Sequence, residues 1–227
     1  MKKAVAFLLA LVCLSAFFVS CSDNAAENAV SYKLDKTIEF GEWNWLVLDV
    51  QDCKALLITE DIVEARIFHD VYEDVTWETC TLRQYLNGEF YDKFNATDQA
   101  RIVEANNINK NNQWFKTNGG NDTTDKVFLL SLEEVVKYFG DSGQLKKRFN
   151  WDTLGIDDEY DSARKAYFNG ESFWWYLRSP GLRQDGAALV GYDGGIVGNG
   201  IVVNYTSCGV RPALWLEVTD DELILIS

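Results

Sequence analysis

The spacing of apolar and polar positions predicts strands at both ends of the chain and helices between them. Apolar positions over 37–50, followed by the apolar run over 54–59, predict two strands of an antiparallel meander. Residues 172–218 have the densest aromatic and β-branched content, which predicts further antiparallel strands. Within them Asp193-Gly194-Gly195 predicts a hairpin turn, because glycine tolerates positive φ.

A helical period begins after this first meander. Apolar side chains spaced i, i+3, i+4 and i+8 predict a helix over 79–94, and they are Leu82, Tyr85, Leu86 and Phe90. Gly88 weakens this helix by about 1 kcal/mol relative to alanine. Thr97-Asp98 predicts the cap of a short second helix, with Ile102 and Val103 on its inward face.

A third helix is indicated by its end signals. The short apolar segment 125–130 predicts a buried strand, and Ser131 follows it directly, three residues before Glu134. This spacing is that of a capping box, and Gly140 predicts the helix end. We therefore expect one globular domain of strands and helices over 37–218, followed by a tail over 219–227.

The polar segment 106–125 is the longest predicted loop, and Trp114-Phe115 lies in its middle. Loops of this length are often functional or mobile. The aromatic pair either fixes the loop to the core or forms an exposed ligand platform, and the first interpretation is favoured.

The first twenty residues predict a targeting segment. Lys2 and Lys3 precede the apolar run 4–18, which is short for a bilayer span, and Ser20 stands before Cys21. The pattern resembles a bacterial lipobox, so residues 1–20 are expected to be a signal peptide and Cys21 the lipidated residue. Ordinary cleavage and an uncleaved anchor are the alternatives. Residues 21–36 are largely small and polar, as in a tether.

The charge of the chain limits its partners. The whole chain carries −14, and residues 21–227 carry −16, from 19 basic and 35 acidic side chains. Such a surface repels phosphate backbones, so no nucleic-acid partner is expected. We expect the lipid to hold the protein in the cell envelope, on the outer or the cytoplasmic membrane.

Cysteine and histidine give little sign of a metal centre. Cys53, Cys80 and Cys208 remain after the leader, without CxxC spacing, so one disulfide with one free thiol and three free thiols are both open. The single histidine, His69, is expected to be a surface or hydrogen-bonded residue, and zinc is disfavoured.

Acidic residues crowd one segment, 152–161. Asp157, Asp158 and Asp161 are candidate ligands for calcium, since close carboxylates share a cation readily. A solvated acidic loop is the favoured interpretation, and no other cofactor is predicted.

Five ordered motifs resemble a known bacterial family. They are Glu42-Trp43-x-Trp45-x-Val47-Leu48-Asp49, Thr81-Leu82-Arg83-Gln84-Tyr85-Leu86-Asn87, Asp125-Lys126-Val127-Phe128-Leu129-Leu130-Ser131, Trp174-Trp175-x-Leu177-Arg178-Ser179-Pro180 and Gly209-Val210-Arg211-Pro212-Ala213-Leu214. Together, over about residues 39–217, they resemble the domain of unknown function DUF6273, which occurs in secreted and lipid-anchored proteins. The closing pattern is similar to the end of bacterial C-type-lectin-like domains, including those related to formylglycine-generating enzymes. This weaker resemblance implies a C-type-lectin-like α+β fold, with two or three helices packed on antiparallel strands, and with long loops that build the ligand surfaces.

The C-terminal segment holds the candidate site residues. Arg178 and Arg211 stand in apolar company and are expected to be structural clamps. Trp174 and Trp175 must face opposite sides of a strand, so one is core and the other can be exposed. The candidate ligand contacts are Trp175, Tyr192, Asp193, Asn199, Asn204 and Tyr205.

Three functions remain open at this point. The leading hypothesis is a non-enzymatic module that binds a protein or a glycan through its C-terminal loops. The second is an enzyme related to formylglycine-generating oxidases, which requires an accessible Cys208 with a nearby thiol and a lowered pKa. The third is a structural envelope protein.

Overall fold

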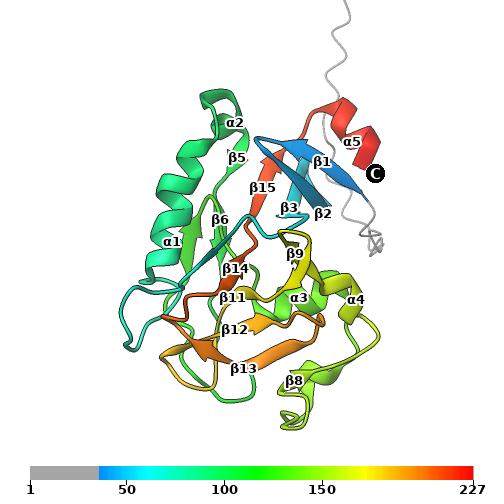
Figure 1. Ribbon diagram of the computed structural model, residues 1–227. Helices are drawn as coiled ribbons and strands as arrows, with labels where there is room; N and C mark the ends of the chain where they lie inside the picture. The colour runs from blue at the N-terminus through cyan, green and yellow to red at the C-terminus, as the bar shows by residue number, and fades with distance from the viewer. Residues whose placement is uncertain (1–35, 227) are drawn as a thin grey trace, which may run out of the picture.

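The structure is a computed structural model that describes residues 36–226 (Figure 1). The expected signal peptide at 1–20, most of the tether and the lipid site at Cys21 lie outside the described residues. Within the described part the fold combines short helices with mostly antiparallel sheets, which confirms the predicted α+β class.

The first sheet joins the two ends of the domain. Its five strands lie in the order β1 (Thr37–Phe40), β2 (Trp43–Gln51), β3 (Lys54–Thr59), β15 (Ala213–Glu217) and β5 (Ile102–Val103). All neighbours are antiparallel. The predicted meander is confirmed, and the last strand of the chain pairs directly with its third.

The second sheet carries most of the C-terminal segment. Its six strands lie in the order β4 (Glu64–Arg66), β14 (Cys208–Val210), β11 (Trp175–Pro180), β12 (Gly186–Val190), β13 (Ile196–Val202) and β8 (Gly155–Ile156). Only the β11–β14 pair is parallel. The β12–β13 turn contains Gly194 at φ +94°, so the predicted hairpin is confirmed.

Two small ribbons and the helices complete the fold. The ribbons are β6 (Ala105–Asn107) with β7 (Thr123–Asp125), and β9 (Ala166–Phe168) with β10 (Glu171–Phe173). The helices are α1 (Thr81–Tyr85), η1 (Leu86–Phe90), η2 (Tyr91–Lys93), α2 (Ala96–Arg101), α3 (Leu132–Phe139), η3 (Gln144–Lys146), α4 (Asp161–Arg164) and α5 (Asp220–Ile226). Figure 1 shows α5 and the first sheet at one end of the molecule and β8 at the other.

The helical predictions are confirmed in outline and corrected in detail. The segment predicted as one helix runs continuously through α1, η1 and η2, but it contains a π-helical turn around Gly88. Asn95, not Thr97-Asp98, caps α2. Ile102 and Val103 form strand β5 rather than a helix face, because they pair with β15. The predicted capping box of α3 is present, with Gly140 after its last turn.

Two further segments differ from expectation. Residues 127–130 are buried as predicted, but they pair regularly only through Phe128, which exchanges hydrogen bonds with Ala213. The segment expected as a tail contains helix α5, whose Glu222 bonds the Thr219 amide and pairs with Arg101 at 2.6 Å.

Three fully buried tryptophans anchor the core. The indole N–H of Trp45 donates to the Phe40 carbonyl, and that of Trp77 donates to the Asp125 carboxylate. The indole N–H of Trp175 donates to the Arg164 carbonyl, and all three bonds measure 2.8–3.0 Å. A buried indole donor without a partner would cost free energy, so these bonds fix each ring in place.

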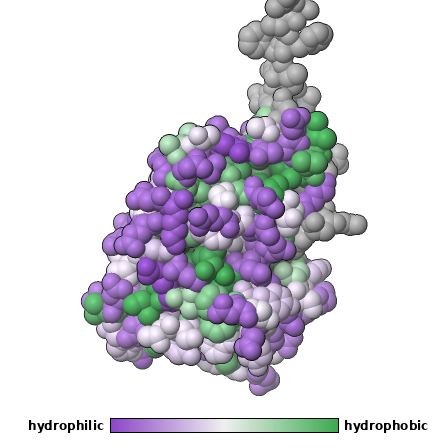
Figure 2. Space-filling model, turned by 45° about the horizontal axis from the view of Figure 1, so that its top comes forward, coloured by the Kyte–Doolittle hydropathy of each residue, from purple (hydrophilic) through white to green (hydrophobic). Residues whose placement is uncertain are grey.

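The face of the molecule seen in Figure 2 is mostly hydrophilic, in keeping with the acidic composition. Exposed apolar residues of the described part of the chain include Ile224 and Leu225 of α5. No helix of residues 36–226 has the length and apolar character needed to cross a membrane.

Candidate functional site

Three aromatic side chains form an exposed strip on the C-terminal half of the domain. The ring centroid of Trp174 lies 6.3 Å from that of Tyr192 and 6.4 Å from that of Tyr205, with interplanar angles of 23° and 15°. Tyr192 is 58% exposed, Tyr205 is 39% exposed and Trp174 is half-buried. We call these residues the aromatic strip.

The backbone around each ring is held by hydrogen bonds. Tyr192 lies in the β12–β13 turn, where its carbonyl accepts a bond from the Ser172 hydroxyl. The Trp174 carbonyl accepts from the Gly209 amide at 2.8 Å, and the Tyr205 carbonyl accepts from the Tyr176 hydroxyl at 3.2 Å. Three loops that are distant in sequence therefore present their rings from fixed positions.

The prediction for Trp175 as a ligand contact is wrong. Trp175 is fully buried, and the Arg211 guanidinium lies over its ring at 5.0 Å. Neighbouring strand residues point to opposite sides, so burial of Trp175 turns Trp174 toward the surface. Trp174 is thus the site residue that the sequence analysis did not select. The sequence shows that Trp174 and Trp175 face opposite sides, but it does not show which of the two faces the core.

The polar candidates are only partly brought together. Asp193 is exposed beside Tyr192 and its Oδ1 accepts from the Gly195 amide at 3.2 Å, while Asn204 is exposed beside Tyr205. Asn199 is half-buried in β13, and its carbonyl bonds the Leu182 amide at 2.8 Å. Asn199 therefore lies beside the 181–185 loop and not at the hairpin turn.

The acidic segment surrounds an arginine of the same chain. Arg164 is fully buried, and its Nη1 lies 2.8 Å from Asp158 Oδ1 and 3.1 Å from Asp161 Oδ1. Burial would raise the pKa of Asp158, but bonds from Arg164 and Ser142 hold it below its ordinary value. Burial, with Asp157 adding to it, raises the pKa of Asp161 to about 6.

This arrangement changes the interpretation of the predicted calcium ligands. The cation between Asp158 and Asp161 is the Arg164 guanidinium, and Asp157 is exposed. Residues 36–226 contain no group of three or more histidine, cysteine, aspartate or glutamate side chains placed to hold a metal ion. Asp157, Asp158 and Asp161 therefore do not form such a group.

The cysteines do not form a reactive pair. Cys80 and Cys208 are free and fully buried, so neither is bridged to the other or to Cys53. Burial raises the pKa of Cys80 to about 12 and moves that of Cys208 well above its ordinary range. Thiols of this kind stay protonated at neutral pH. Cys208 thus lacks the exposure and the lowered pKa that the oxidase hypothesis requires.

Arg178 and Arg211, the two arginines expected to be clamps, each donate hydrogen bonds to distant segments of the chain. Arg178 donates to both carboxylate oxygens of Glu134 and, at 2.7 Å, to the Leu129 carbonyl. Arg211 donates to the Thr59 and Glu60 carbonyls at 2.8 and 3.0 Å, and burial lowers its pKa to about 10. Both guanidinium groups are buried.

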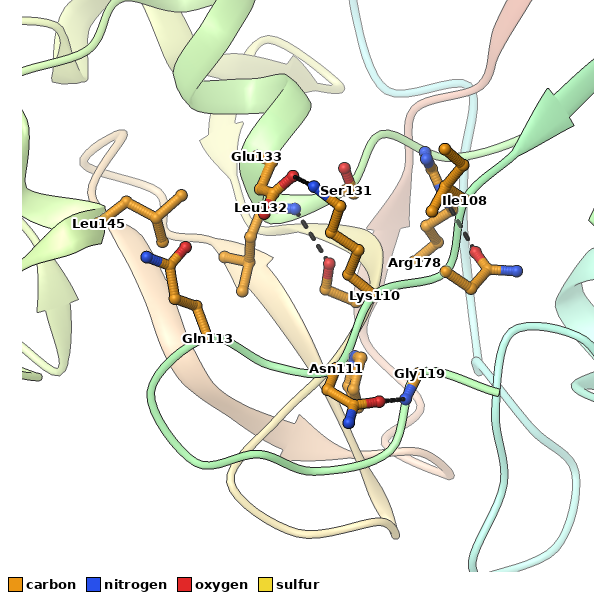
Figure 3. A pocket seen from close by; sticks show the side chains of 13 residues that line it. Ile108, Lys110, Asn111, Gln113, Gly119, Ser131, Leu132, Glu133, Leu145 and Arg178 are labelled. Atoms are coloured by element: carbon orange, nitrogen blue, oxygen red, sulfur yellow. Dashed lines mark hydrogen bonds and ion pairs between the residues drawn. The ribbon is translucent and has the colours of Figure 1, made fainter. Parts of the chain in front are cut away.

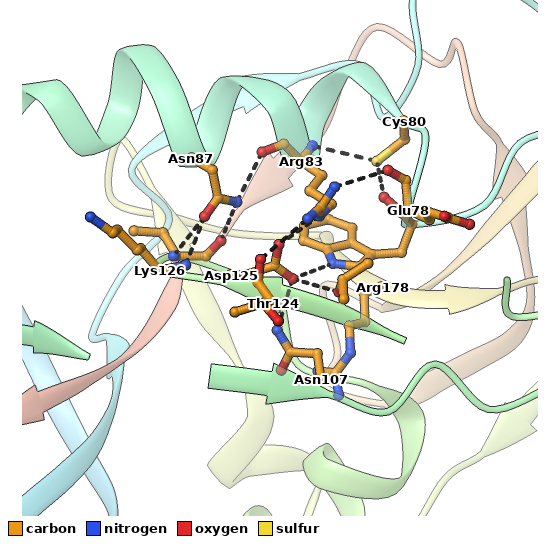
Figure 4. Close-up of polar contacts among 12 residues, drawn as sticks. Glu78, Cys80, Arg83, Asn87, Asn107, Thr124, Asp125, Lys126 and Arg178 are labelled. Carbon is orange, nitrogen blue, oxygen red and sulfur yellow. Dashed lines mark hydrogen bonds and ion pairs between the residues drawn. The ribbon is translucent and has the colours of Figure 1, made fainter. Parts of the chain in front are cut away.

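A third clamp, centred on Asp125, was not predicted (Figure 4). This buried carboxylate accepts hydrogen bonds of 2.5–3.0 Å from four side chains, which are Arg83, Trp77, Asn107 and Thr123. Asn87 binds the adjoining strand end, accepting from the Lys126 amide at 2.8 Å and donating to the Val127 carbonyl at 2.9 Å. The motif residues Arg83, Asn87 and Asp125 therefore have structural roles.

The loop over 106–125 is fixed to the domain, as the favoured interpretation predicted. The Trp114 indole donates to the Lys147 carbonyl at 3.0 Å, and the ring packs directly over Gly198. Buried Asn112 donates to the Pro180 and Gly198 carbonyls at 2.8 and 3.1 Å. His69 is likewise hydrogen-bonded, to Glu73 and to the Thr81 amide.

A small pocket lies at the start of helix α3 (Figure 3). Its cationic groups already have partners, because Lys110 pairs with Glu133 at 2.7 Å and Arg178 pairs with Glu134. The Leu132 amide at the helix start bonds the Ser179 hydroxyl at 3.0 Å. The pocket therefore offers no unpaired charge to a ligand.

These features define an α+β domain with clamped loops and an exposed aromatic surface. The sequence model of the family described as "Domain of unknown function (DUF6273)" matches residues 52–218, and the chain belongs to this family. The motif at 42–49 lies outside the matched range. No curated protein and no solved structure matches this chain.

Proposed function

We propose that this protein is a lipid-anchored recognition module of the cell envelope. It acts by binding a glycan on the aromatic strip and not by catalysis. The anchor is proposed from the leader and Cys21. The observation that carries the binding proposal is the strip itself, three near-parallel rings of which Tyr192 and Tyr205 are exposed and Trp174 is half-buried.

The chemistry of the strip suits a sugar. Aromatic faces bury the C–H face of a pyranose ring, and stiff rings lose little conformational entropy on binding. Asp193 and Asn204 stand exposed beside the rings and can bond the hydroxyl groups of the sugar. Tyrosine and tryptophan are also frequent in contacts between proteins, so the test must distinguish a glycan from a protein partner.

We also propose the C-type-lectin-like arrangement for this fold. It is supported by helices packed with antiparallel strands and by a ligand surface on C-terminal loops. The resemblance to the lectin-like end pattern supports the same placement of the ligand.

A glycan array probed with the full chain in phosphatidylcholine nanodiscs tests the binding proposal. We expect a restricted set of glycans to bind, and Trp174→Ala and Tyr192→Ala each to weaken binding by at least about tenfold. Tyr72→Ala is the matched control, since Tyr72 is 55% exposed but lies outside the strip. Equal binding by wild type and the strip variants would refute the site, and binding only to protein probes would refute the glycan.

The anchor is tested independently of the ligand. Metabolic labelling with a fatty-acid analogue is expected to label the wild-type chain in a bacterial host, and Cys21→Ser is expected to abolish the label. Labelling that persists in Cys21→Ser would contradict lipidation at this residue.

A further inference from the structure

A second exposed surface, separate in its residues from the aromatic strip, combines cations with aromatic rings. It consists of the consecutive Lys146, Lys147 and Arg148 together with Phe115 and Trp151, and we call it the basic–aromatic corner. All three cations are exposed, and Trp151 is 57% exposed. The proposed function above makes no use of these residues.

The cations of the corner have no partners among residues 36–226. None of their side chains makes a hydrogen bond, an ion pair or a ring contact there. Other basic residues of the same domain are paired, including Arg83, Arg164 and Arg178. In a chain of net charge −14, three adjacent unpaired cations are a distinct local feature.

The rings of the corner are held in place from beneath. Phe149, only 7% exposed, contacts Trp114, Phe115 and Trp151 with centroid distances of 5.2, 4.6 and 4.8 Å. Trp114 packs against Gly198 of β13, where an added Cβ would lie 2.0 Å from its ring. Exposed Trp151 and half-buried Phe115 are therefore held against the second sheet through Phe149 and Trp114.

Nearby acids do not cancel this positive charge. Asp141 and Asp152 are the exposed carboxylates of residues 141–152, and neither forms an ion pair with the three cations. Charges at a distance act weakly, because the Debye length is about 8 Å at physiological ionic strength. A ligand touching the corner would thus meet the local cations rather than the net charge of the chain.

We propose that the basic–aromatic corner binds an anionic polysaccharide. A guanidinium binds carboxylate or phosphate groups through two parallel hydrogen bonds, lysines add point charges, and the rings of Trp151 and Phe115 pack on the sugars between. Cations at three successive positions beside two rings suit a linear polymer with a charge in each repeat.

The location favours a polymer over the membrane that holds the protein. Lys36, the first described residue, donates to the Leu225 carbonyl of α5, whereas the corner directly precedes β8, at the opposite end of the molecule (Figure 1). An N-terminal anchor would therefore attach at the end of the domain opposite to the corner. The position of the corner relative to the membrane depends on the anchor in the proposed function. The assignment of a ligand to the corner does not depend on it.

The test measures binding of fluorescent polygalacturonate to the full chain in phosphatidylcholine nanodiscs, with neutral dextran as the comparison polymer. We expect binding to polygalacturonate only, weakening as salt is raised. Lys146→Gln with Lys147→Gln should lower the affinity at least tenfold, and Trp151→Ala at least threefold. The control is Lys54→Gln with Lys165→Gln, which should change the affinity less than twofold. These two cations are half-buried and also lack side-chain partners within the described part of the chain.

Three results would overturn the proposal. Equal losses of affinity from both lysine pairs would mean diffuse charge attraction. No binding of polygalacturonate would exclude anionic polysaccharides as the ligand. Binding to phosphatidylglycerol vesicles in place of the polymer would assign the corner to a membrane. Because this assay uses no neutral glycan, its failure is distinguishable from failure of the aromatic strip.

Discussion

The Arg178 guanidinium and the Glu134 carboxylate form a two-point ion pair that joins strand β11 to the first turn of helix α3. The same carboxylate accepts the Ser131 amide at 2.8 Å and so completes the capping box of that helix. One acidic side chain therefore both begins a helix and neutralises a buried arginine. This relationship connects two of the motifs that resemble the family.

Replacing Glu134 with alanine should destabilise the domain strongly. It leaves the buried Arg178 charge without its partner and removes a helix cap, a loss of about 3 kcal/mol or more. Urea unfolding followed by circular dichroism measures the change. The control is Glu133→Ala, because Glu133 forms an exposed pair with Lys110 and should contribute less than about 1 kcal/mol. Equal effects of the two variants would contradict the clamp.

The stability of the domain should fall in acid. Burial alone would raise the pKa of Glu134, but the Arg178 charge and the Ser131 bonds hold it below its ordinary value. A carboxyl with a lowered folded pKa stabilises the fold above its unfolded pKa and loses this effect as pH falls through the folded pKa. Asp158 behaves alike, so the free energy of unfolding should decline below about pH 5. Urea titrations from pH 7 to pH 3 should show a shallower decline for Glu134→Gln, and an identical decline would contradict this origin.

Gly198→Ala should disturb the loop packed on β13. The new methyl group would lie 2.0 Å from the Trp114 ring, so the ring must move, at a cost of about 1–3 kcal/mol. Gly88→Ala is the comparison, since an added Cβ there meets no atom within 4 Å and alanine favours a helix by about 1 kcal/mol. The melting temperature should fall for Gly198→Ala and rise for Gly88→Ala. Unchanged stability in Gly198→Ala would mean that Trp114 does not pack there.

The two buried thiols should resist alkylation. Burial raises the pKa of Cys80 to about 12 and that of Cys208 further, so little thiolate forms at pH 8. Iodoacetamide treatment followed by peptide mass spectrometry should leave both residues unmodified in the folded chain and modify both in denaturant. Rapid native alkylation of Cys208 would restore the oxidase hypothesis.

Local signals in the sequence predicted much of the fold. The Ser131 and Glu134 spacing predicted the start of α3, and Asp193-Gly194-Gly195 predicted the hairpin, because caps and turns depend on a few neighbouring residues. The predicted clamp roles of Arg178 and Arg211 followed from charge in apolar surroundings. These features need no knowledge of distant partners.

Features set by tertiary packing were not predictable. Ile102 and Val103 became a strand because β15 lies beside them, and Asp158 and Asp161 meet Arg164 rather than a metal ion. Trp174 directly precedes Trp175, the first residue of β11, so the two side chains must face opposite sides. Only the burial of Trp175 against Arg211 showed which one is core. The segment 172–218 contains all three rings of the aromatic strip, and Tyr192 and Tyr205 were candidates, but the stacking of Trp174 against both depends on tertiary packing.

The motifs that resemble the family inform the fold more than the ligand. Arg83, Asp125, Arg178 and Arg211 all make buried structural bonds. The exposed rings of Tyr192 and Tyr205 lie outside the motifs, and Trp174 is the motif residue that joins them. Ligand recognition is therefore expected to reside in the loops between the clamps.

The most direct test of the aromatic strip is a two-dimensional ¹⁵N NMR titration of the eight tryptophan indole signals with a glycan that the array identifies. Trp174→Phe assigns the decisive signal. We expect the Trp174 indole resonance to shift in a saturable way while that of buried Trp175 shifts much less. A titration that moves other indole signals and leaves Trp174 in place would contradict the strip as the binding site.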